Sequence, residues 1–68
     1  MQYFNYYVSP QLRRAVLREN PEFDTFEQVC VYRFNAGCEF VGDYEEVVLS
    51  GEAGCVLDTV QYLNKVQF

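Results

Sequence analysis

The sequence predicts a small α+β domain in which an antiparallel sheet carries two helices on one face, in the order β-α-β-β-α. Three observations lead to this prediction: an aromatic segment at residues 2–8, an amphipathic pattern after Ser50-Gly51, and a run of strand-forming residues between them. The chain has 68 residues, which is enough for one domain over residues 1–68. A domain of this size buries only about 60% of the surface that its unfolded chain exposes.

Residues 2–8 combine aromatic side chains with a final valine and predict the first strand. Ser9 and Pro10 predict the start of a helix, because serine is a favoured N-cap and proline is tolerated at the first helical position. Asn20-Pro21 predicts its end, since the residue before a proline is pushed out of the helical conformation. The apolar face of this helix is expected to be Leu12, Ala15 and Val16.

The segment from residue 26 to residue 49 allows two interpretations. In the first, residues 29–34 form a strand, residues 35–37 form a turn, and residues 38–49 return as a second strand. The returning strand would place Phe40, Tyr44 and Val48 on one side, and Glu39, Asp43 and Glu45 on the other.

The second interpretation is helical. The pairs Asp24/Glu27 and Asp43/Glu46 have the spacing of capping boxes, which would begin a helix at each place and make the chain all-α. Because such four-residue patterns arise often by chance, the hairpin is the favoured interpretation.

The final segment predicts an amphipathic helix. Its apolar residues recur three and four positions apart, and they are Ala53, Val56, Leu57, Val60 and Leu63. Lys65, near the expected C-terminal end, suits the negative end of the helix dipole.

Several chemistries are not expected. The chain has no histidine, which removes histidine bases and histidine metal ligands. Its three cysteines lie eight and seventeen residues apart and match no zinc pattern, and no phosphate-binding loop or EF-hand loop is present. We therefore expect neither a cofactor nor an enzyme. Paired carboxylates acting as acid and base remain a third and weaker hypothesis.

The cysteines and the termini bear on the compartment. Cys30, Cys38 and Cys55 are odd in number and have apolar neighbours, so they are expected to be reduced, buried thiols. No signal peptide and no apolar stretch of about 20 residues is evident. The expectation is a cytoplasmic protein that does not enter a membrane.

The charge distribution is uneven. The net charge is −5, yet all ten acidic residues lie between Glu19 and Asp58, where Arg33 is the one basic residue. Arg13, Arg14 and Arg18 cluster on the first predicted helix. Direct binding to nucleic acid is not expected, because the phosphate backbone is neutralised by lysine and arginine.

The acidic stretch admits two interpretations. It can be a solubilising surface, or it can be a ridge that docks into the basic groove of a protein that holds DNA or RNA. In the second interpretation aromatic rings such as Tyr44 and Phe40 serve as apolar anchors. The predicted partner-binding residues are Glu39, Asp43, Tyr44, Glu45, Glu46, Glu52 and Asp58.

The leading functional hypothesis is an interaction protein that inhibits or occupies a nucleic-acid-handling protein. In size, acidity and lack of catalytic residues the chain is similar to the inhibitors that phages and other mobile elements direct at host defence or nucleic-acid enzymes; this likeness covers no residue pattern. The alternative is a structural or regulatory homo-oligomer with an aromatic self-interface. In a homodimer, the first helix could also pair its arginines with the acidic ridge of a second copy.

Overall fold

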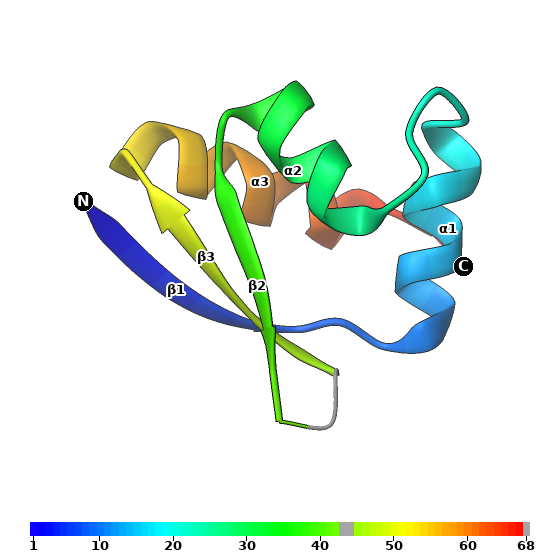
Figure 1. The fold of residues 1–68 in the computed structure, drawn as a ribbon, viewed down its shortest axis with the longest axis horizontal. Coiled ribbons are helices and arrows are strands. Elements are labelled where there is room, and N and C mark those ends of the chain that lie inside the picture. The colour runs from blue at the N-terminus through cyan, green and yellow to red at the C-terminus, as the bar shows by residue number, and fades with distance from the viewer. Residues whose placement is uncertain (43–44, 68) are drawn as a thin grey trace.

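The computed structural model describes residues 1–42 and 45–67. The elements in chain order are β1 (Gln2–Tyr7), α1 (Pro10–Glu19), α2 (Phe26–Phe34), β2 (Gly37–Val41), β3 (Glu46–Gly51) and α3 (Ala53–Lys65). The strands form one antiparallel sheet in the order β1-β3-β2 (Figure 1). The predicted α+β class is confirmed, and the all-α alternative is wrong.

The central strand β3 pairs with an edge strand on each side. Phe4 of β1 lies opposite Leu49, and Phe40 of β2 lies opposite Val47. Because residues paired across an antiparallel sheet point to the same face, these four side chains share one face. Val47 and Leu49 are fully buried there.

The core lies between this face and the helices, which gather on one side of the sheet (Figure 1). The helix α2 packs on β2 and against α1, while α3 packs on β1 and β3. The ring of Phe26 on α2 meets the ring of Phe40 edge-on, with their centroids 5.8 Å apart. Burial of these apolar faces provides the main stabilisation of the fold.

The prediction of a strand at residues 29–34 is wrong, because these residues belong to α2. Thr25 caps the helix by accepting a hydrogen bond of 3.2 Å from the Gln28 backbone N–H. The Gln28 side chain in turn accepts a bond of 2.8 Å from the Asp24 backbone N–H. The capping-box signal was therefore present, one residue later than the Asp24/Glu27 pair. A strand would place Val29 and Val31 on one face, yet Val29 is buried and Val31 is 45% exposed.

The prediction of one returning strand over residues 38–49 is also wrong, because this segment contains both β2 and β3. The chain turns after Val41, and Gly42 adopts a φ of 63°, which favours glycine. Because of this turn, Phe40 and Val48 do not share a side as one continuous strand would require. Phe40 faces the helices, whereas Val48 lies opposite Glu39 on the other face. A helix beginning at the Asp43/Glu46 pair is wrong as well, since Glu46 begins β3. Asp43 and Tyr44 lie outside the described residues.

The remaining elements match their predictions. The Ser9 side chain caps α1 by accepting a hydrogen bond of 3.1 Å from the Leu12 backbone N–H, and α1 ends at Glu19, just before Asn20-Pro21. The predicted apolar face of α3 is only partly buried. Thr59 is fully buried, whereas Leu57 is 55% exposed.

Candidate functional site

The second face of the sheet points away from the helices and is open to solvent. We call it the outer sheet face. By the pairing register, it consists of Tyr3, Asn5 and Tyr7 on β1, Glu46, Val48 and Ser50 on β3, and Glu39 and Val41 on β2. Its aromatic rings are well exposed, Tyr3 by 68% and Tyr7 by 60%. Large exposed aromatic residues are frequent in protein interfaces.

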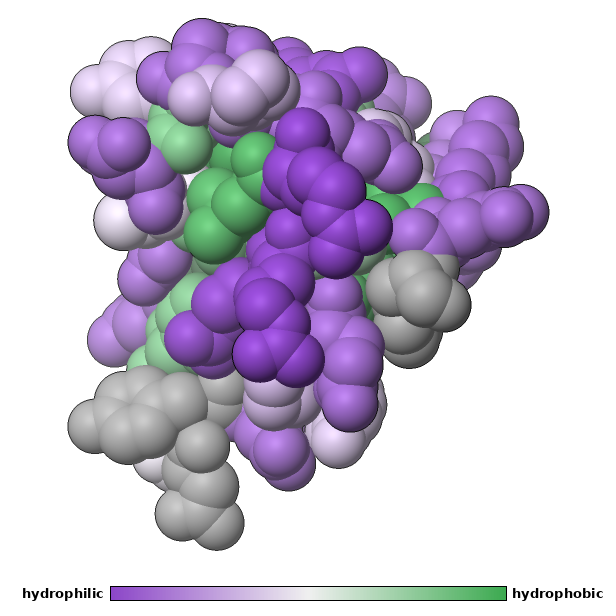
Figure 2. Space-filling view, turned by 90° about the vertical axis from the view of Figure 1, so that its right-hand side faces the viewer, coloured by the Kyte–Doolittle hydropathy of each residue, from purple (hydrophilic) through white to green (hydrophobic). Residues whose placement is uncertain are grey.

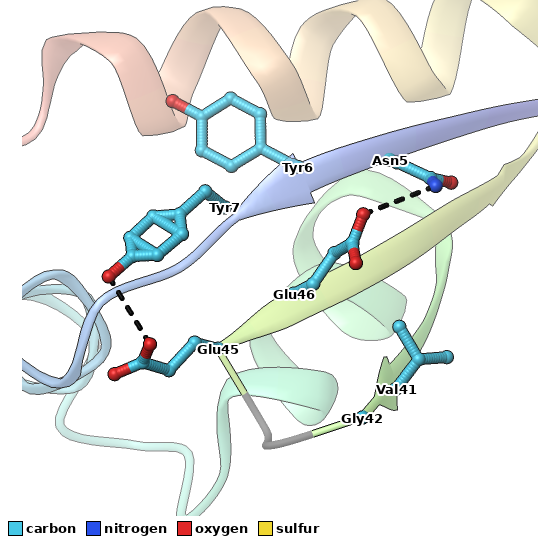
Figure 3. Close-up of a pocket in the computed structure, with 7 residues that line it drawn as sticks. All are labelled: Asn5, Tyr6, Tyr7, Val41, Gly42, Glu45 and Glu46. Carbon is cyan, nitrogen blue, oxygen red and sulfur yellow. Dashed lines mark hydrogen bonds between the residues drawn. The ribbon is translucent and has the colours of Figure 1, made fainter.

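The end of this face nearest the β2–β3 turn is hollowed. An open cavity of about 460 Å³ is lined by residues of all three strands and the turn. Within it, the Tyr7 hydroxyl donates to the Glu45 carboxylate at 3.4 Å, and the Asn5 amide donates to the Glu46 carboxylate at 3.3 Å (Figure 3). These contacts orient two carboxylates beside aromatic and amide groups, and they leave carboxylate oxygens available to a partner.

Charge is segregated between the two layers of the fold. The five basic residues all lie on helices, and they are Arg13, Arg14, Arg18, Arg33 and Lys65. Residues 1–9 and 35–51, which contain the strands, carry four carboxylates and no basic side chain. The rest of the chain carries six carboxylates and five basic groups, which leaves it nearly neutral. These strand-containing segments therefore account for most of the net charge, and Glu39, Glu45 and Glu46 among their described residues generate a negative potential at the uncovered face of the sheet.

The structure brings together three of the predicted partner-binding residues. Glu46 and Glu39 share the outer sheet face, where Glu46 lies opposite Val41 and Glu39 lies two residues further along β2. Glu45 precedes β3 and is exposed, and it lines the hollow at the end of this face, where its carboxylate accepts from the Tyr7 hydroxyl. Asp43 and Tyr44, also predicted, lie outside the described residues.

The other two predicted residues lie elsewhere. Glu52 is the N-cap residue of α3, beyond the opposite end of β3 from Glu45. Asp58 is exposed on α3, in the helical layer behind the sheet. Neither residue therefore belongs to the outer sheet face with Glu39 and Glu46.

Sequence reasoning missed the contribution of β1, namely Tyr3, Asn5 and Tyr7. The signal was the alternation within residues 2–7, where these odd-numbered positions share a face. Which face is uncovered depends on pairing with β3, whose residues lie 39 to 49 positions further along the chain, and residues 2–7 contain no information on that pairing.

Arg13 of α1 and Arg33 of α2 make contacts within the chain. The Arg13 guanidinium lies over the Phe40 ring at 4.2 Å from its centroid, and Arg33 lies over the Tyr62 ring at 4.6 Å. The side of the molecule that carries α1 is mostly hydrophilic, with small apolar areas between polar side chains (Figure 2). Arginine stacking of this kind holds positive charge against the core, and the Arg33 guanidinium also donates to the buried Asn20 side chain.

Comparison with known protein families, with curated proteins and with solved structures finds no match to the chain. Within residues 1–42 and 45–67, no group of three or more Cys, Asp or Glu side chains is placed to hold a metal ion. None of the helices in the described part of the chain has the length and apolar character needed to cross a membrane. The fold and the site define a small α+β domain with an uncovered acidic and aromatic sheet face.

Proposed function

We propose that this domain binds a protein through its outer sheet face and occupies that protein's basic nucleic-acid-binding surface. The observation that supports this most directly is the segregation of charge: the strand-containing segments carry no basic side chain, and all five basic residues lie in the helical layer. A basic groove meets negative potential on this face without an opposing cation in the contact area.

The outer sheet face also contains apolar anchors. Tyr3 and Tyr7 flank Asn5 along β1, and Val48 lies between Glu46 and Ser50 on β3. Carboxylates provide steering and specificity, whereas buried aromatic rings provide most of the binding free energy in protein interfaces. The pattern of carboxylates beside tyrosine rings therefore suits a groove that normally takes phosphates and stacked bases.

The proposed activity is binding without catalysis. The chain has no histidine, and the described residues that line the hollow form an open surface at which Tyr7 and Asn5 engage the carboxylates. Inhibition of a host nucleic-acid enzyme, as practised by phages and other mobile elements, is the biological setting that we propose for such a binder.

The experiment begins with affinity capture from host lysate on the tagged chain, followed by elution in a salt gradient and identification by mass spectrometry. The captured protein is then purified, and its affinity for the chain is measured against salt concentration and in competition with the nucleic acid that it binds. We expect affinity to fall steeply with salt and the chain to compete with the nucleic acid.

Two charge-matched double variants localise the contact. The variant Glu39→Lys/Glu46→Lys reverses two charges on the outer sheet face, and Glu27→Lys/Asp58→Lys reverses two exposed charges on the helices. We expect the first to weaken binding at least ~100-fold and the second to change it by less than about threefold, because only the first faces the partner. Equal losses of affinity from both variants would show that net charge alone governs binding. No loss of affinity from the first variant would refute the proposed surface.

A further inference from the structure

Exposed apolar side chains are concentrated along one edge of the molecule. Among the large hydrophobic residues that are exposed in the described chain, five lie on or beside β1 or on the side of α3 that faces it. They are Met1, Tyr3, Phe4, Tyr7 and Leu57. Phe4 and Leu57 line a groove of about 290 Å³ between β1 and α3. Its other lining residues are Gln2, Tyr3, Ala53, Val56 and Val60, so none of the described residues that line the groove has a charged side chain.

The strand β1 is an edge of the sheet, and its outward hydrogen-bonding groups can be assigned. The Val8 backbone N–H donates to the Glu45 carbonyl at 2.6 Å, and this pair continues the register of β1 with β3. Because bonded pairs alternate along an antiparallel ladder, the even-numbered residues of β1 bond to β3. Tyr3, Asn5 and Tyr7 consequently direct their backbone N–H and C=O groups outward. The strand has no proline and no charged side chain of the kind that protects edges from pairing.

We infer that a second copy of this chain pairs with β1 in antiparallel orientation about a two-fold axis. With the register centred on Asn5, Tyr3 lies opposite Tyr7 of the second copy, and Phe4 lies opposite Tyr6 of the second copy. Each outward N–H and C=O of the three odd-numbered residues finds a partner, and aromatic residues face aromatic residues on both sides of the sheet. The product is a six-stranded sheet with the helices of both copies on the same side.

The contact between the two copies extends from β1 to the helical layer. Leu57 and Ala53 of α3 are exposed beside the groove, so the two-fold axis brings the grooves of both copies toward each other. Placing these side chains against their equivalents removes apolar surface from water, which favours association.

The charge pattern favours a second copy of the chain over a basic protein as the molecule that pairs with β1 and covers the groove. Two molecules of net charge −5 repel each other, and contact is least unfavourable through a surface that lacks carboxylates. Neither β1 nor the lining of the groove contains a charged side chain. A basic partner would gain nothing from this neutral edge, whereas a copy of the same neutral, aromatic edge matches it in both charge and hydrogen bonding.

This inference does not depend on the proposed function, because it concerns the purified chain alone. The edge and the outer sheet face share Tyr3, Asn5 and Tyr7, but pairing uses the backbone edge of β1 and leaves Glu39 on β2 and Glu46 on β3 uncovered. The dimer would join two outer sheet faces into one continuous surface.

The test is sedimentation velocity on the purified chain from about 1 to about 300 µM, a range that spans the affinities of small interfaces. We expect the mass to rise from 8.0 kDa toward twice that value with concentration. We also expect dimerisation to strengthen with added salt, because salt screens the repulsion between two acidic molecules. Salt has the opposite effect on the proposed partner binding, so the two associations can be told apart.

Three variants locate the interface. Asn5→Pro removes an outward N–H and keeps the backbone hydrogen bonds to β3, although it also removes the side-chain bond from Asn5 to Glu46, and Leu57→Glu places a carboxylate at the groove. Val31→Glu is the control, since it makes the same change of charge at an exposed apolar residue of α2. We expect the first two to weaken dimerisation at least ~10-fold and the control to have little effect.

Circular dichroism verifies folding, and Leu57→Glu serves as the decisive variant if Asn5→Pro does not fold. A monomer at every concentration would overturn the inference, even if a peptide of another protein were found to pair with β1. A dimer that survives Leu57→Glu but is lost in Val31→Glu would also overturn it, because the interface would then lie on α2.

Discussion

Arg33 donates a hydrogen bond of 2.6 Å to the side-chain oxygen of Asn20, thirteen residues earlier in the chain. Asn20 is 2% exposed, and its amide nitrogen donates to the Val16 carbonyl at 2.8 Å and to the Tyr62 hydroxyl at 3.0 Å. One buried side chain thus joins α2 and α3 to the end of α1. Because all of its hydrogen-bonding groups are paired, its burial is compatible with a stable core.

Replacing Asn20 with alanine should therefore destabilise the fold. We expect Asn20→Ala to lower the free energy of unfolding by about 1–3 kcal/mol, since it leaves buried partners without a hydrogen bond. Urea denaturation followed by circular dichroism measures the change. Asn64→Ala is the matched control. Asn64 is exposed and accepts one bond from the Tyr6 hydroxyl, so this variant should lower the free energy of unfolding by less than about 1 kcal/mol. Equal effects from both variants would contradict a structural role for the buried amide.

Tyr62 should make stability sensitive to alkaline pH. Burial, and then the hydrogen bond that its hydroxyl donates to the Glu19 carboxylate at 2.8 Å, raise the pKa of Tyr62 above its ordinary value of 10.0. The folded chain then holds this proton more tightly than the unfolded chain. The resulting stabilisation is fully present below pH 10.0 and is lost as pH rises through the higher pKa of the folded state.

Urea denaturation at a series of pH values on both sides of 10.0, the ordinary pKa of tyrosine, tests this expectation. Tyr62→Phe should flatten the alkaline decline, whereas Tyr32→Phe, which keeps Tyr62, should retain it. A decline of the same size in Tyr62→Phe would assign the effect to other groups.

Adjacent valines on β3 should differ in their contribution to stability. Val47 is fully buried against the helices, while Val48 is half-buried on the outer sheet face. Val47→Ala should lower the free energy of unfolding by about 2 kcal/mol, because it removes two buried methyl groups and leaves a cavity. Val48→Ala should lower it by about half as much or less. Thermal or urea denaturation of the two variants compares them directly, and a larger loss from Val48→Ala would contradict the assignment of the two faces.

The cysteines should differ in reactivity. All three are free thiols, and Cys30 is buried while Cys38 and Cys55 are half-buried. A side-chain hydrogen bond with Cys38, followed by burial, raises the pKa of the Cys30 thiol and so disfavours the reactive thiolate. In native buffer, iodoacetamide should modify Cys55 well before Cys30, as read by peptide mass spectrometry, and urea should remove the difference. Early modification of Cys30 in the folded chain would show that its environment is open.

The parts of the fold that were predictable are those with local signals. Ser9-Pro10 and Asn20-Pro21 delimit α1 through backbone geometry that the residues themselves impose. The segment of residues 26–34 was misassigned because its valine, tyrosine and phenylalanine content is typical of strands, whereas the cap at Thr25 and the burial of Phe26 and Val29 make it a helix. Tertiary contacts override such propensities when the other conformation buries an apolar face.

For the candidate site, the sequence indicated acidic residues from Glu39 to Asp58. The structure brings Glu39, Glu45 and Glu46 together and places Glu52 and Asp58 elsewhere. The sequence did not indicate Tyr3 and Tyr7, because their place beside these carboxylates depends on pairing between β1 and β3. Long-range pairing of this kind is decided by how the whole apolar face is buried, and residues 2–7 alone do not encode it.

By itself, the sequence determined the class of fold, the ends of α1, the position of α3 and the excess of carboxylates, because capping, periodicity and charge are local properties. For α2 the sequence contained a cap at Thr25 and Gln28 but also strand-forming residues, and the tertiary structure decided between them. Only the tertiary structure decided that β3 lies between β1 and β2 and that every basic residue falls in the helical layer. The physical reason is that a strand has two faces, and which of them becomes buried is settled by packing against helices distant in the chain. That choice leaves the carboxylates and tyrosines of the outer sheet face in solvent.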